Sequence, residues 1–421
     1  MPDPAPTRDA ADSPLAEALT GLALASTSLR PDDIAAAVAR HVCRLGFTDL
    51  RIYLADLEQR VLVHLPASGE PASEPLAVDG TVAGRAYRTE RPVVSRGERG
   101  DNGSEGGSEG EGVLVWLPLL DSAERLGVLA FRTRDEIDDD LLTTAQAVTN
   151  LVGEIVANKS DYGDTIVRTR RIQEVSLPAE MRWAMLPPLT YTAGNIAISG
   201  IVEPAYEVAG DTFDYAVNGE QAHVAIIDAI GHGLEASRIA NLAVLAYRHS
   251  RRRDLDSVET YLEMDRVIAD QFGSEKFATA QLASLDLSSG QLCWINAGHP
   301  PPMVIRQGHR VDLPHEVFLP IGLSAVDPTA VPQMTEAFLE PGDLVLFFTD
   351  GVVEARSPDG EQFGRERLGD LMERAAAAAQ KPAETMRLLG HAVLDHQNGM
   401  LQDDATLLLL AWQGPSRAVP A

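Results

Sequence analysis

The pattern of apolar and polar positions divides the 421-residue chain into three sections. In the first, residues 15 to about 150, "LAEALTGLALASTSL" and "DDIAAAVARHVCRLGF" repeat apolar residues at helical spacing. "LRIYLAD" and "RVLVHLP" alternate and predict paired strands, and "DGTVAGRAYRTERPVV" predicts a short helix followed by a strand. Two further strands, "VLVWLPLL" and "RLGVLAFRT", complete a section that is predicted to be a compact α+β domain.

The middle section has the pattern of a helical linker. "DDDLLTTAQAVTNLVGEIVANKS" begins with aspartates that suit a helix N-terminus. Helix is expected to resume from about Asp164 towards "LPP" at 186–188. Pro178 argues against one unbroken rod, because proline lacks a backbone N–H and collides with the preceding turn. We expect this section to link two domains and to take part in dimerisation.

The third section, 189 to about 412, predicts more strands than helices. Its strand-like segments are "NIAISGIVEPA", "HVAIIDA", "FATAQLASLDL", "QLCWINAG", "LVLFFTD" and "DDATLLLLAW". Two helical patterns lie near 233–272 and two more near 366–395. This balance predicts a sheet-on-sheet core flanked by helices.

Five segments follow from these patterns and from the polar stretches between them. Residues 96–112, "RGERGDNGSEGGSEGEG", form an acidic Gly-rich loop inside the first domain. The predicted organisation is a disordered leader (1–14), a first domain (15–155), a helical linker (156–188), a second domain (189–413) and a tail (414–421).

Composition restricts the partners and the compartment. The chain has 62 acidic and 35 basic residues, a formal net charge of −27. Such a field repels nucleic acid and anionic lipid and favours cations, although solubility alone also accounts for it. The two cysteines, Cys43 and Cys293, cannot form a disulfide framework, which favours a reducing compartment. No apolar run approaches the roughly 20 residues that span a bilayer. We expect a cytoplasmic protein with no nucleic-acid or membrane partner.

The stretch "IIDAIGHGLEAS" (226–237) first raises the question of a phosphate-binding loop. "GHGLEA" fits the G-x-G-x-x-A dinucleotide fingerprint between a strand and a helix. That fingerprint expects a second strand ending in an acidic residue about 20 residues further on. Here the helix runs into "YRHSRRRDLDSVETYLEM", which is basic and then helical again, so we disfavour nucleotide binding.

Aspartates instead recur at the ends of apolar strands beside glycines. Asp211 lies in "VAGDTFDY", Asp228 in "IIDAIGHG" and Asp350 in "LVLFFTDGVVEAR", while Asp403 and Asp404 open "QDDATLLLL". One such aspartate is most simply a turn former. Four together predict a buried carboxylate cluster, whose mutual repulsion a hard divalent cation would relieve.

Two metal ions about 3.5–4 Å apart supply a specific chemistry, in which an activated water attacks phosphorus in line. No protein nucleophile is then required. The sequence agrees, because a cysteine-dependent phosphatase needs an arginine six residues after its cysteine. Cys43 is followed there by Asp49, and Cys293 by His299.

From about 180 to 412 the chain resembles the PPM family of metal-dependent serine/threonine phosphatases. It is most similar to the bacterial stage II sporulation protein E-like branch, which includes sigma-factor regulatory phosphatases. The landmarks are "AMLPP", "EPAYEVAGDTFDY", "IIDAIGHGLEAS", "FATAQLASLDLSSGQLCWINAGHPPP", "LEPGDLVLFFTDGVVEAR" and "QDDATLLLL", in that order. The resemblance implies an α-β-β-α sandwich that binds two Mn²⁺ or Mg²⁺ ions.

By the same resemblance, the catalytic metal ligands are Asp211 and Asp228 from one side and Asp350 and Asp403 from the other. Asp228 is the candidate to bridge the two ions, and the backbone carbonyl of Ala229 adds a ligand. Many relatives have glycine where this chain has Ala209 and Ala229, and a positive φ at either position would be strained.

Four further residues of this section have candidate supporting roles. His232 can shuttle a proton, but a structural or outer-shell role is favoured, as it is for His299 in "NAGHPPP". Asp404 and Asp214 are candidate outer-shell partners of the ligands, with plain turn roles as the alternative.

The first section resembles a GAF sensory domain, through "LAVDGTVAGRAYRTERPVVS" and "WLPLLDSAERLGVLAFRT". The resemblance implies a pocket for a small-molecule ligand, or a packing and dimerisation module. Together the two resemblances predict a homodimeric phosphatase, regulated by its GAF-like domain, that acts on a phosphorylated anti-sigma-factor antagonist. The alternatives are a non-catalytic docking module, which would lack the carboxylates, and a small-molecule phosphohydrolase.

Overall fold

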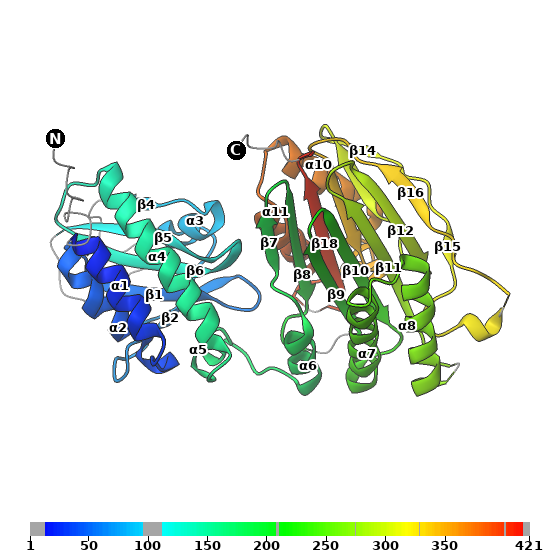
Figure 1. Ribbon diagram of the computed structural model, residues 1–421, viewed down its shortest axis with the longest axis horizontal. Coiled ribbons are helices and arrows are strands. Elements are labelled where there is room, and N and C mark those ends of the chain that lie inside the picture. Colours follow the sequence, from blue (N-terminus) through cyan, green and yellow to red (C-terminus); the bar gives the residue numbers. More distant parts are fainter. Residues whose placement is uncertain are drawn as a thin grey trace, which may run out of the picture. The chain divides into compact units, whose positions relative to one another are not determined.

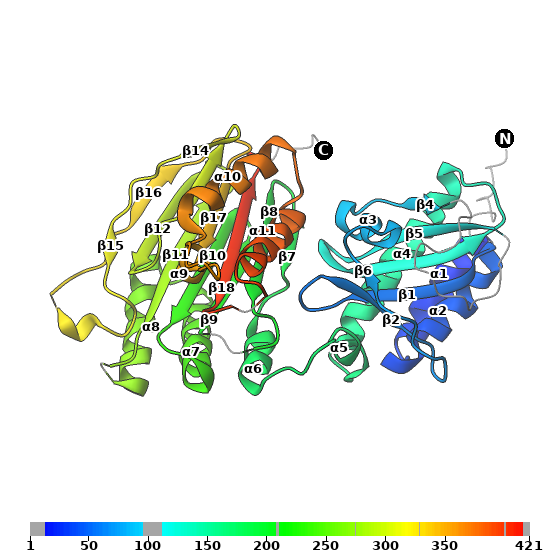
Figure 2. The same ribbon diagram turned by 180° about the vertical axis from the view of Figure 1, so that it is seen from behind.

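The structure is a computed structural model that describes residues 13–95, 112–207, 210–273, 275–327, 329–399 and 401–415. The chain divides between Gln173 and Glu174 into two units (Figures 1 and 2). Apart from their end residues, the predicted leader, acidic loop and tail lie outside the described residues. No helix in the described ranges is long and apolar enough to cross a membrane.

The first unit is a six-stranded antiparallel sheet with the strand order β3-β2-β1-β6-β5-β4. Its strands are β1 (Thr48–Ala55), β2 (Val61–Leu65), β3 (Leu76–Ala77), β4 (Val93–Ser95), β5 (Val113–Asp121) and β6 (Glu124–Thr133). Its helices are α1 (Pro14–Ser26), α2 (Ile34–Val42), α3 (Val82–Thr89), α4 (Asp139–Ser160) and α5 (Thr165–Thr169), with short 3₁₀ turns on either side of α2.

Helices cover this sheet on both faces, which explains the long apolar runs in β5 and β6. One core packs α1, α2 and α4 against the sheet, with Phe47 and Phe131 stacked 4.0 Å apart. A smaller core lies under α3. The predicted cap of α4 is confirmed, because Asp138 accepts a 2.8 Å hydrogen bond from the Leu141 N–H. Gly153 lets α4 approach closely, since a Cβ there would lie 1.9 Å from the Leu120 carbonyl oxygen.

The helical stretch after the first unit is interrupted, as Pro178 predicts. After α5 the chain is not helical until α6 (Leu177–Met185), which belongs to the second unit. Ser176 caps α6, and Pro178 lies in its first turn, where a missing N–H has no cost.

The second unit contains two six-stranded sheets and the helices that cover them. One sheet has the order β15-β12-β11-β10-β9, with β16 also paired to β12, and the other has the order β14-β13-β17-β18-β8-β7. The strands are β7 (Thr190–Ala193), β8 (Ile196–Glu203), β9 (Asp211–Asn218), β10 (Gln221–Ala229), β11 (Ala278–Asp286), β12 (Gln291–Ala297), β13 (Met303–Arg306), β14 (His309–Val311), β15 (Val317–Phe318), β16 (Thr335–Phe338), β17 (Leu344–Phe348) and β18 (Ala405–Trp412). The helices after α6 are α7 (Gly233–Arg251), α8 (Ser257–Phe272), α9 (Asp350–Glu354), α10 (Gly364–Ala377) and α11 (Pro382–His396).

Three apolar cores hold this unit together as four layers. The inner core, which contains Trp294 and Trp412, lies between the two sheets. A second core joins α7 and α8 to the β9–β12 sheet, and a third joins α9, α10 and α11 to the other sheet. The predicted α-β-β-α sandwich is therefore confirmed, and Figures 1 and 2 show its helical layers from opposite sides.

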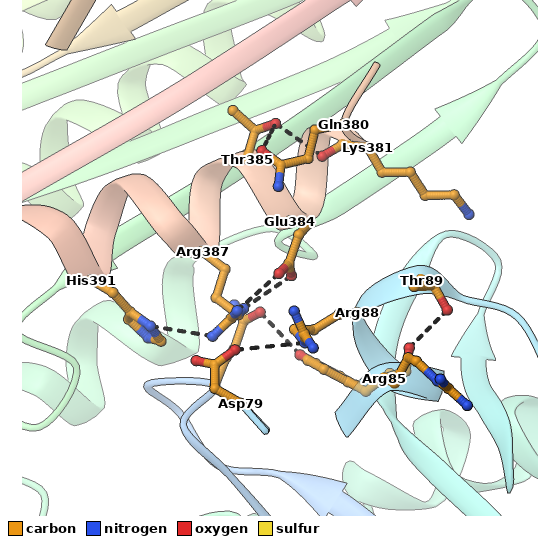
Figure 3. Close-up of polar contacts among 12 residues, drawn as sticks. Asp79, Arg85, Arg88, Thr89, Gln380, Lys381, Glu384, Thr385, Arg387 and His391 are labelled. Atoms are coloured by element: carbon orange, nitrogen blue, oxygen red, sulfur yellow. Dashed lines mark hydrogen bonds and ion pairs between the residues drawn. The ribbon is translucent and has the colours of Figure 1, made fainter. Parts of the chain in front are cut away.

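Helix α11 packs on β8 and β18 and carries a polar cluster of its own. Arg387 donates to Glu384 through Nε (3.0 Å) and Nη2 (2.8 Å), and its Nη1 lies 3.3 Å from Nδ1 of His391 (Figure 3). All three residues lie on one side of the helix because they are spaced three or four residues apart.

The strand β10 pairs directly with β11 in antiparallel register, so α7 and α8 form an excursion between neighbouring strands. Within the described residues, the strand that follows "GHGLEA" and its two helices is antiparallel to β10, so the parallel β-α-β unit that the dinucleotide fingerprint requires is not formed there. The excursion leaves β10 one residue after Asp228, which is opposite Thr279 of β11.

Candidate metal centre

The structure brings the four predicted metal ligands to one end of the sandwich. Asp211 opens β9 and is paired in register with Asp228 near the end of β10. In the other sheet, Asp350 begins α9 directly after β17, and Asp403 lies just before β18. Because β17 and β18 are antiparallel neighbours, the end of one and the start of the other meet at the same edge.

Two of the four carboxylates, Asp211 and Asp228, continue the inner faces of their strands, which are apolar over most of their length. On β9, Phe213 and Tyr215 belong to the core between the sheets, and alternation places Asp211 on the same side. On β10, Ile226 is in that core and Asp228 is the next inward residue. By the same alternation, the inner face becomes polar at this end through Asp211, Asp228, Thr279, Gln281, Asn296, Thr349 and Thr406.

Asp211 is the most buried of the four ligands and is fixed by a hydroxyl from the opposite sheet. Thr349 donates to its Oδ2 at 2.7 Å and itself accepts a 3.0 Å hydrogen bond from the Thr406 N–H. Burial raises the pKa of Asp211 well above its usual value, and the nearby negative charges of Asp228 and Asp404 raise it further.

Asp228 is close enough to Asp350 and Asp403 of the opposite sheet for their negative charges to raise its pKa. Burial is the largest cause that raises its pKa to about 7, followed by the charges of Asp350 and Asp403. Asp350 is exposed, and its pKa is raised by desolvation and then by Asp403. Carboxylates that raise one another's pKa are a donor set suited to divalent cations, which supply the missing positive charge.

The ligand set is divided between the two sheets. Within the described ranges, no three acidic, histidine or cysteine side chains already converge as a complete metal-ligand group. The aspartates instead form two facing pairs, Asp211 with Asp228 and Asp350 with Asp403. An ion bound between the pairs would draw ligands from both sheets.

The backbone around Ala229 accommodates alanine. Its N–H donates to the Gly210 carbonyl at 3.1 Å, and a Cβ on Gly210 would lie only 2.4 Å from the Ala229 oxygen. Ala229 does not have a positive φ, so replacing the glycine of many relatives by alanine causes no backbone strain at this position. Ala209 lies outside the described residues.

Asp404 has the contacts of a residue that supports the ligands. Its Oδ2 accepts a 2.6 Å hydrogen bond from the Gly210 N–H, next to Asp211, and its own N–H donates to Oδ1 of Asp403 at 2.9 Å. Burial raises the pKa of Asp404 to about 7, against the opposing effect of the Arg182 guanidinium.

Arg182 is a cation enclosed behind the carboxylates. It extends from α6, its residue is 2% exposed, and it donates to the Pro204 carbonyl. Its Nε and Nη1 have no hydrogen-bond partner, and the carboxylates that favour its charge are Asp404, Asp211 and Glu203. Burial lowers the pKa of Arg182, but an arginine remains charged at working pH. The cation therefore offsets part of the local negative charge.

Asp214 lies on the other face of β9, beneath α7, and not beside the metal ligands. Arg248 donates to its Oδ1 (2.7 Å) and Arg251 to its Oδ2 (2.9 Å). Asp214 is 1% exposed, so its charge depends on these partners. Its position gives it a role in fixing α7 to the sheet.

We expect Asp214→Ala to destabilise the protein without weakening metal binding. Removing one member of a buried ion pair leaves uncompensated charge and costs about 3 kcal/mol. Urea denaturation measures the stability, and Mn²⁺ titration of the folded variant measures the affinity. Asp359→Ala, an exposed aspartate of the same unit, is the control. A stability equal to that of the control, or a Mn²⁺ affinity weakened tenfold or more, would contradict this role.

The two candidate histidines, His232 and His299, have different surroundings. His232 is exposed at the N-terminus of α7 and makes no capping hydrogen bond through its side chain. His299 is 3% exposed and lies in the interior, where burial lowers its pKa to about 3.

Sequence reasoning missed Thr349, Gly210 and Arg182 as parts of this site. A signal for Thr349 exists in "FFTDG", where it directly precedes Asp350. For Gly210 the signal is its place before Asp211. Arg182 lies in another element, and no local pattern connects it with the aspartates.

Comparisons with known proteins give the class of each unit. Residues 218–413 match the family model of stage II sporulation protein E, and residues 28–157 match that of a GAF domain. The chain thus carries a domain of the stage II sporulation protein E family, preceded in sequence by a GAF domain, and both resemblances drawn from the sequence are confirmed.

Several curated proteins and solved structures are similar. Protein IcfG of Synechocystis sp. is 25% identical over 272 residues, which are 57% of this chain and 40% of that protein. Phosphoserine phosphatase RsbU of Bacillus subtilis is 24% identical over 238 residues, 56% of this chain and 69% of the relative. The structure of the RsbU and RsbW domains of a Mycobacterium tuberculosis protein has 25% identity and a TM-score of 0.46, covering 54% of this chain and 63% of that one. This chain thus spans only 40% of the length of IcfG.

Proposed function

We propose that this chain is a metal-dependent protein serine/threonine phosphatase that hydrolyses phosphoserine or phosphothreonine. The observation that carries the proposal is the meeting of Asp211 and Asp228 from one sheet with Asp350 and Asp403 from the other. The family match of residues 218–413 supports it.

Asp211, Asp228, Asp350 and Asp403 would hold two Mn²⁺ or Mg²⁺ ions, with the Ala229 carbonyl as a further ligand. Such a pair of ions supplies the positive charge that activates water for attack on phosphorus and stabilises the leaving oxygen. Thr349 orients Asp211 through its hydroxyl, and Asp404 connects Asp403 with Gly210. These supporting groups are attached to rigid strands, which favours a fixed ligand geometry.

The cysteines support a mechanism without a protein nucleophile. Both are free thiols, with Cys43 in the first unit and Cys293 on β12. Burial raises the pKa of the Cys293 thiol, and the charge of Glu336 raises it further. A thiol with a raised pKa is a poor nucleophile.

The substrate that we propose is a phosphorylated anti-sigma-factor antagonist in a bacterial signalling pathway. This assignment follows from the family resemblance and from similarity to RsbU and RsbP of Bacillus subtilis, both named phosphoserine phosphatases. We further propose a cytoplasmic homodimer in which the GAF domain, with or without a small-molecule ligand, regulates hydrolysis.

The first test is metal-dependent hydrolysis. We expect p-nitrophenyl phosphate and a phosphoserine protein to be hydrolysed with Mn²⁺ or Mg²⁺, and the activity to fall at least 100-fold in excess EDTA and to return on adding metal. Circular dichroism would show that the protein remains folded in EDTA. Hydrolysis that persists in EDTA would contradict a two-metal mechanism. Far faster turnover of the small ester than of any phosphoprotein would indicate a small-molecule phosphohydrolase.

A further inference from the structure

His299 follows β12, in a loop that ends inside the polar part of the sandwich. Its Nδ1 lies 2.8 Å from Oγ1 of Thr279, on β11. Thr279 is the cross-strand partner of Asp228. One hydrogen bond therefore connects the histidine ring to the residue beside the candidate bridging ligand.

The loop around His299 is anchored on both sides, which fixes the ring. Its backbone N–H donates to Oδ1 of Asn296 at 2.7 Å, and the carbonyl of the next residue, Pro300, accepts a 2.9 Å hydrogen bond from Nε2 of Gln281. Gln281 and Asn296 are themselves cross-strand partners on β11 and β12. The histidine is thus part of the rigid β9–β12 sheet.

The ring also lies close to the opposite sheet. The backbone carbonyl of Phe348, the last residue of β17, is near enough to raise the pKa of the ring, although burial lowers it more. Nε2 is buried and has no hydrogen-bond partner among the described residues. Asp350 follows Phe348 by two residues.

We propose that His299 is a positioning residue of the metal centre, which links Thr279 beside Asp228 to the end of β17 that carries Asp350. In this role it sets the separation between the carboxylates of the two sheets. The inference rests on the proposed function, because it concerns ligands that would hold the two ions.

The surroundings of the His299 ring favour a positioning role over simple packing in the core. Ile295 and Ala297, which face α7 and α8 on the other side of β12, are apolar, whereas the inner residues Gln281 and Asn296 that anchor the loop are polar. Nδ1 of the ring contacts the Thr279 hydroxyl, and the ring lies near the Phe348 carbonyl of the opposite sheet. A ring that stays neutral, as a pKa of about 3 ensures, also adds no positive charge that would repel the bound ions.

The test uses the full chain and variants that retain different parts of the ring. His299→Asn can place an amide near the position of Nδ1, His299→Leu retains neither nitrogen, and Thr279→Val removes the hydroxyl while keeping the side-chain shape. His315→Asn, at an exposed histidine of the same unit, is the control. Mn²⁺ affinity is measured by calorimetry, kcat and the metal dependence of hydrolysis are measured together, and thermal unfolding in EDTA reports on the metal-free fold.

We expect His299→Leu to weaken Mn²⁺ binding by about 10- to 100-fold, as loss of a partner that orients metal ligands does. Thr279→Val should shift the affinity in the same direction, and His299→Asn should retain part of it. Affinity and metal dependence within twofold of wild type in all three variants, even with a lowered unfolding temperature, would overturn the proposal. If His299→Leu does not fold, the other two variants decide. Wild-type protein that binds no Mn²⁺ would overturn the proposed function itself, which is a separate result.

Discussion

Replacing Asp228 by asparagine is expected to abolish metal-dependent hydrolysis, with a fall in kcat/KM of about 10³-fold or more, equivalent to about 4 kcal/mol of transition-state stabilisation. Asp228 interacts with Asp211 in its own sheet and with Asp350 and Asp403 across the sandwich. An amide is a weak ligand for a hard cation, so the substitution removes the group through which both ions would be held. Asp350→Asn is expected to act in the same direction.

The measurement is steady-state hydrolysis of p-nitrophenyl phosphate over a range of Mn²⁺ concentrations. Asp359→Asn, which changes an exposed aspartate of the same unit, is the matched control and should keep wild-type activity. Hydrolysis by Asp228→Asn within tenfold of wild type at saturating Mn²⁺ would exclude Asp228 as a ligand.

Asp228→Asn also has an expected effect on stability that is opposite to its effect on activity. In the metal-free protein the folded-state pKa of Asp228 is about 7, whereas an unfolded aspartate titrates near 4. The folded state therefore favours the protonated form. The contribution of the protonated Asp228 to folding stability is fully present below about pH 4 and is lost as the pH rises towards 7.

The neutral amide avoids that loss. In EDTA at pH 8 we expect the variant to be more stable than wild type by about 1–3 kcal/mol, and at pH 4 we expect the difference to vanish. Urea denaturation at both pH values measures it. Equal stability of the two proteins at pH 8 would show that neither burial nor the neighbouring charges appreciably disfavour the ionised Asp228 carboxylate.

Arg182→Met is expected to give a large loss of stability in metal-free protein. The arginine is buried beside Asp404, Asp211 and Glu203, and removing it leaves their charges without this counter-ion. Breaking a buried ionic arrangement by removing one partner costs about 3–5 kcal/mol. Methionine keeps most of the apolar stem, so the loss reports mainly on the charge.

Two conditions should reduce the loss caused by Arg182→Met. Mn²⁺ would replace the missing positive charge, and a pH near 5 would protonate the carboxylates whose pKa values are raised. Urea unfolding of wild type and variant, with and without Mn²⁺ and at pH 5 and pH 8, measures the loss of stability in each of the four conditions. Arg252→Met, on an exposed arginine at the end of α7, is the control. A loss that is the same in all four conditions would mean that Arg182 acts through packing and not through its charge.

Three of the candidate ligands, Asp228, Asp350 and Asp403, can be picked out from the sequence because each follows or precedes a strand with a clear apolar pattern. Asp350 after "LVLFF" and Asp403 before "ATLLLL" are examples. The strand β9 was not predicted, although it carries Asp211. Its inner face has an aspartate in line with Phe213 and Tyr215, and its outer face has the buried Asp214, so charge interrupts the alternation on both sides.

Other parts of the fold depend on contacts that no local pattern contains. The strands β13 to β16 are two to four residues long, too short for a period to be recognised. The buried position of Arg182 depends on how α6 packs against the sandwich, and an arginine in an isolated helix would be expected to face solvent. These features follow only from the assembled second unit.

The placement of β18 has a consequence for protein synthesis. It is the final strand of the described chain, yet it lies in the interior of its sheet between β17 and β8, and Asp403 and Asp404 immediately precede it. Asp211, Asp228 and Asp350 all leave the ribosome before the strand that completes their surroundings. A translation product truncated ahead of β18 therefore has an open sheet and an incomplete set of ligands. The order of the elements thus makes the complete candidate metal centre a late product of synthesis, formed only after β18 has been added.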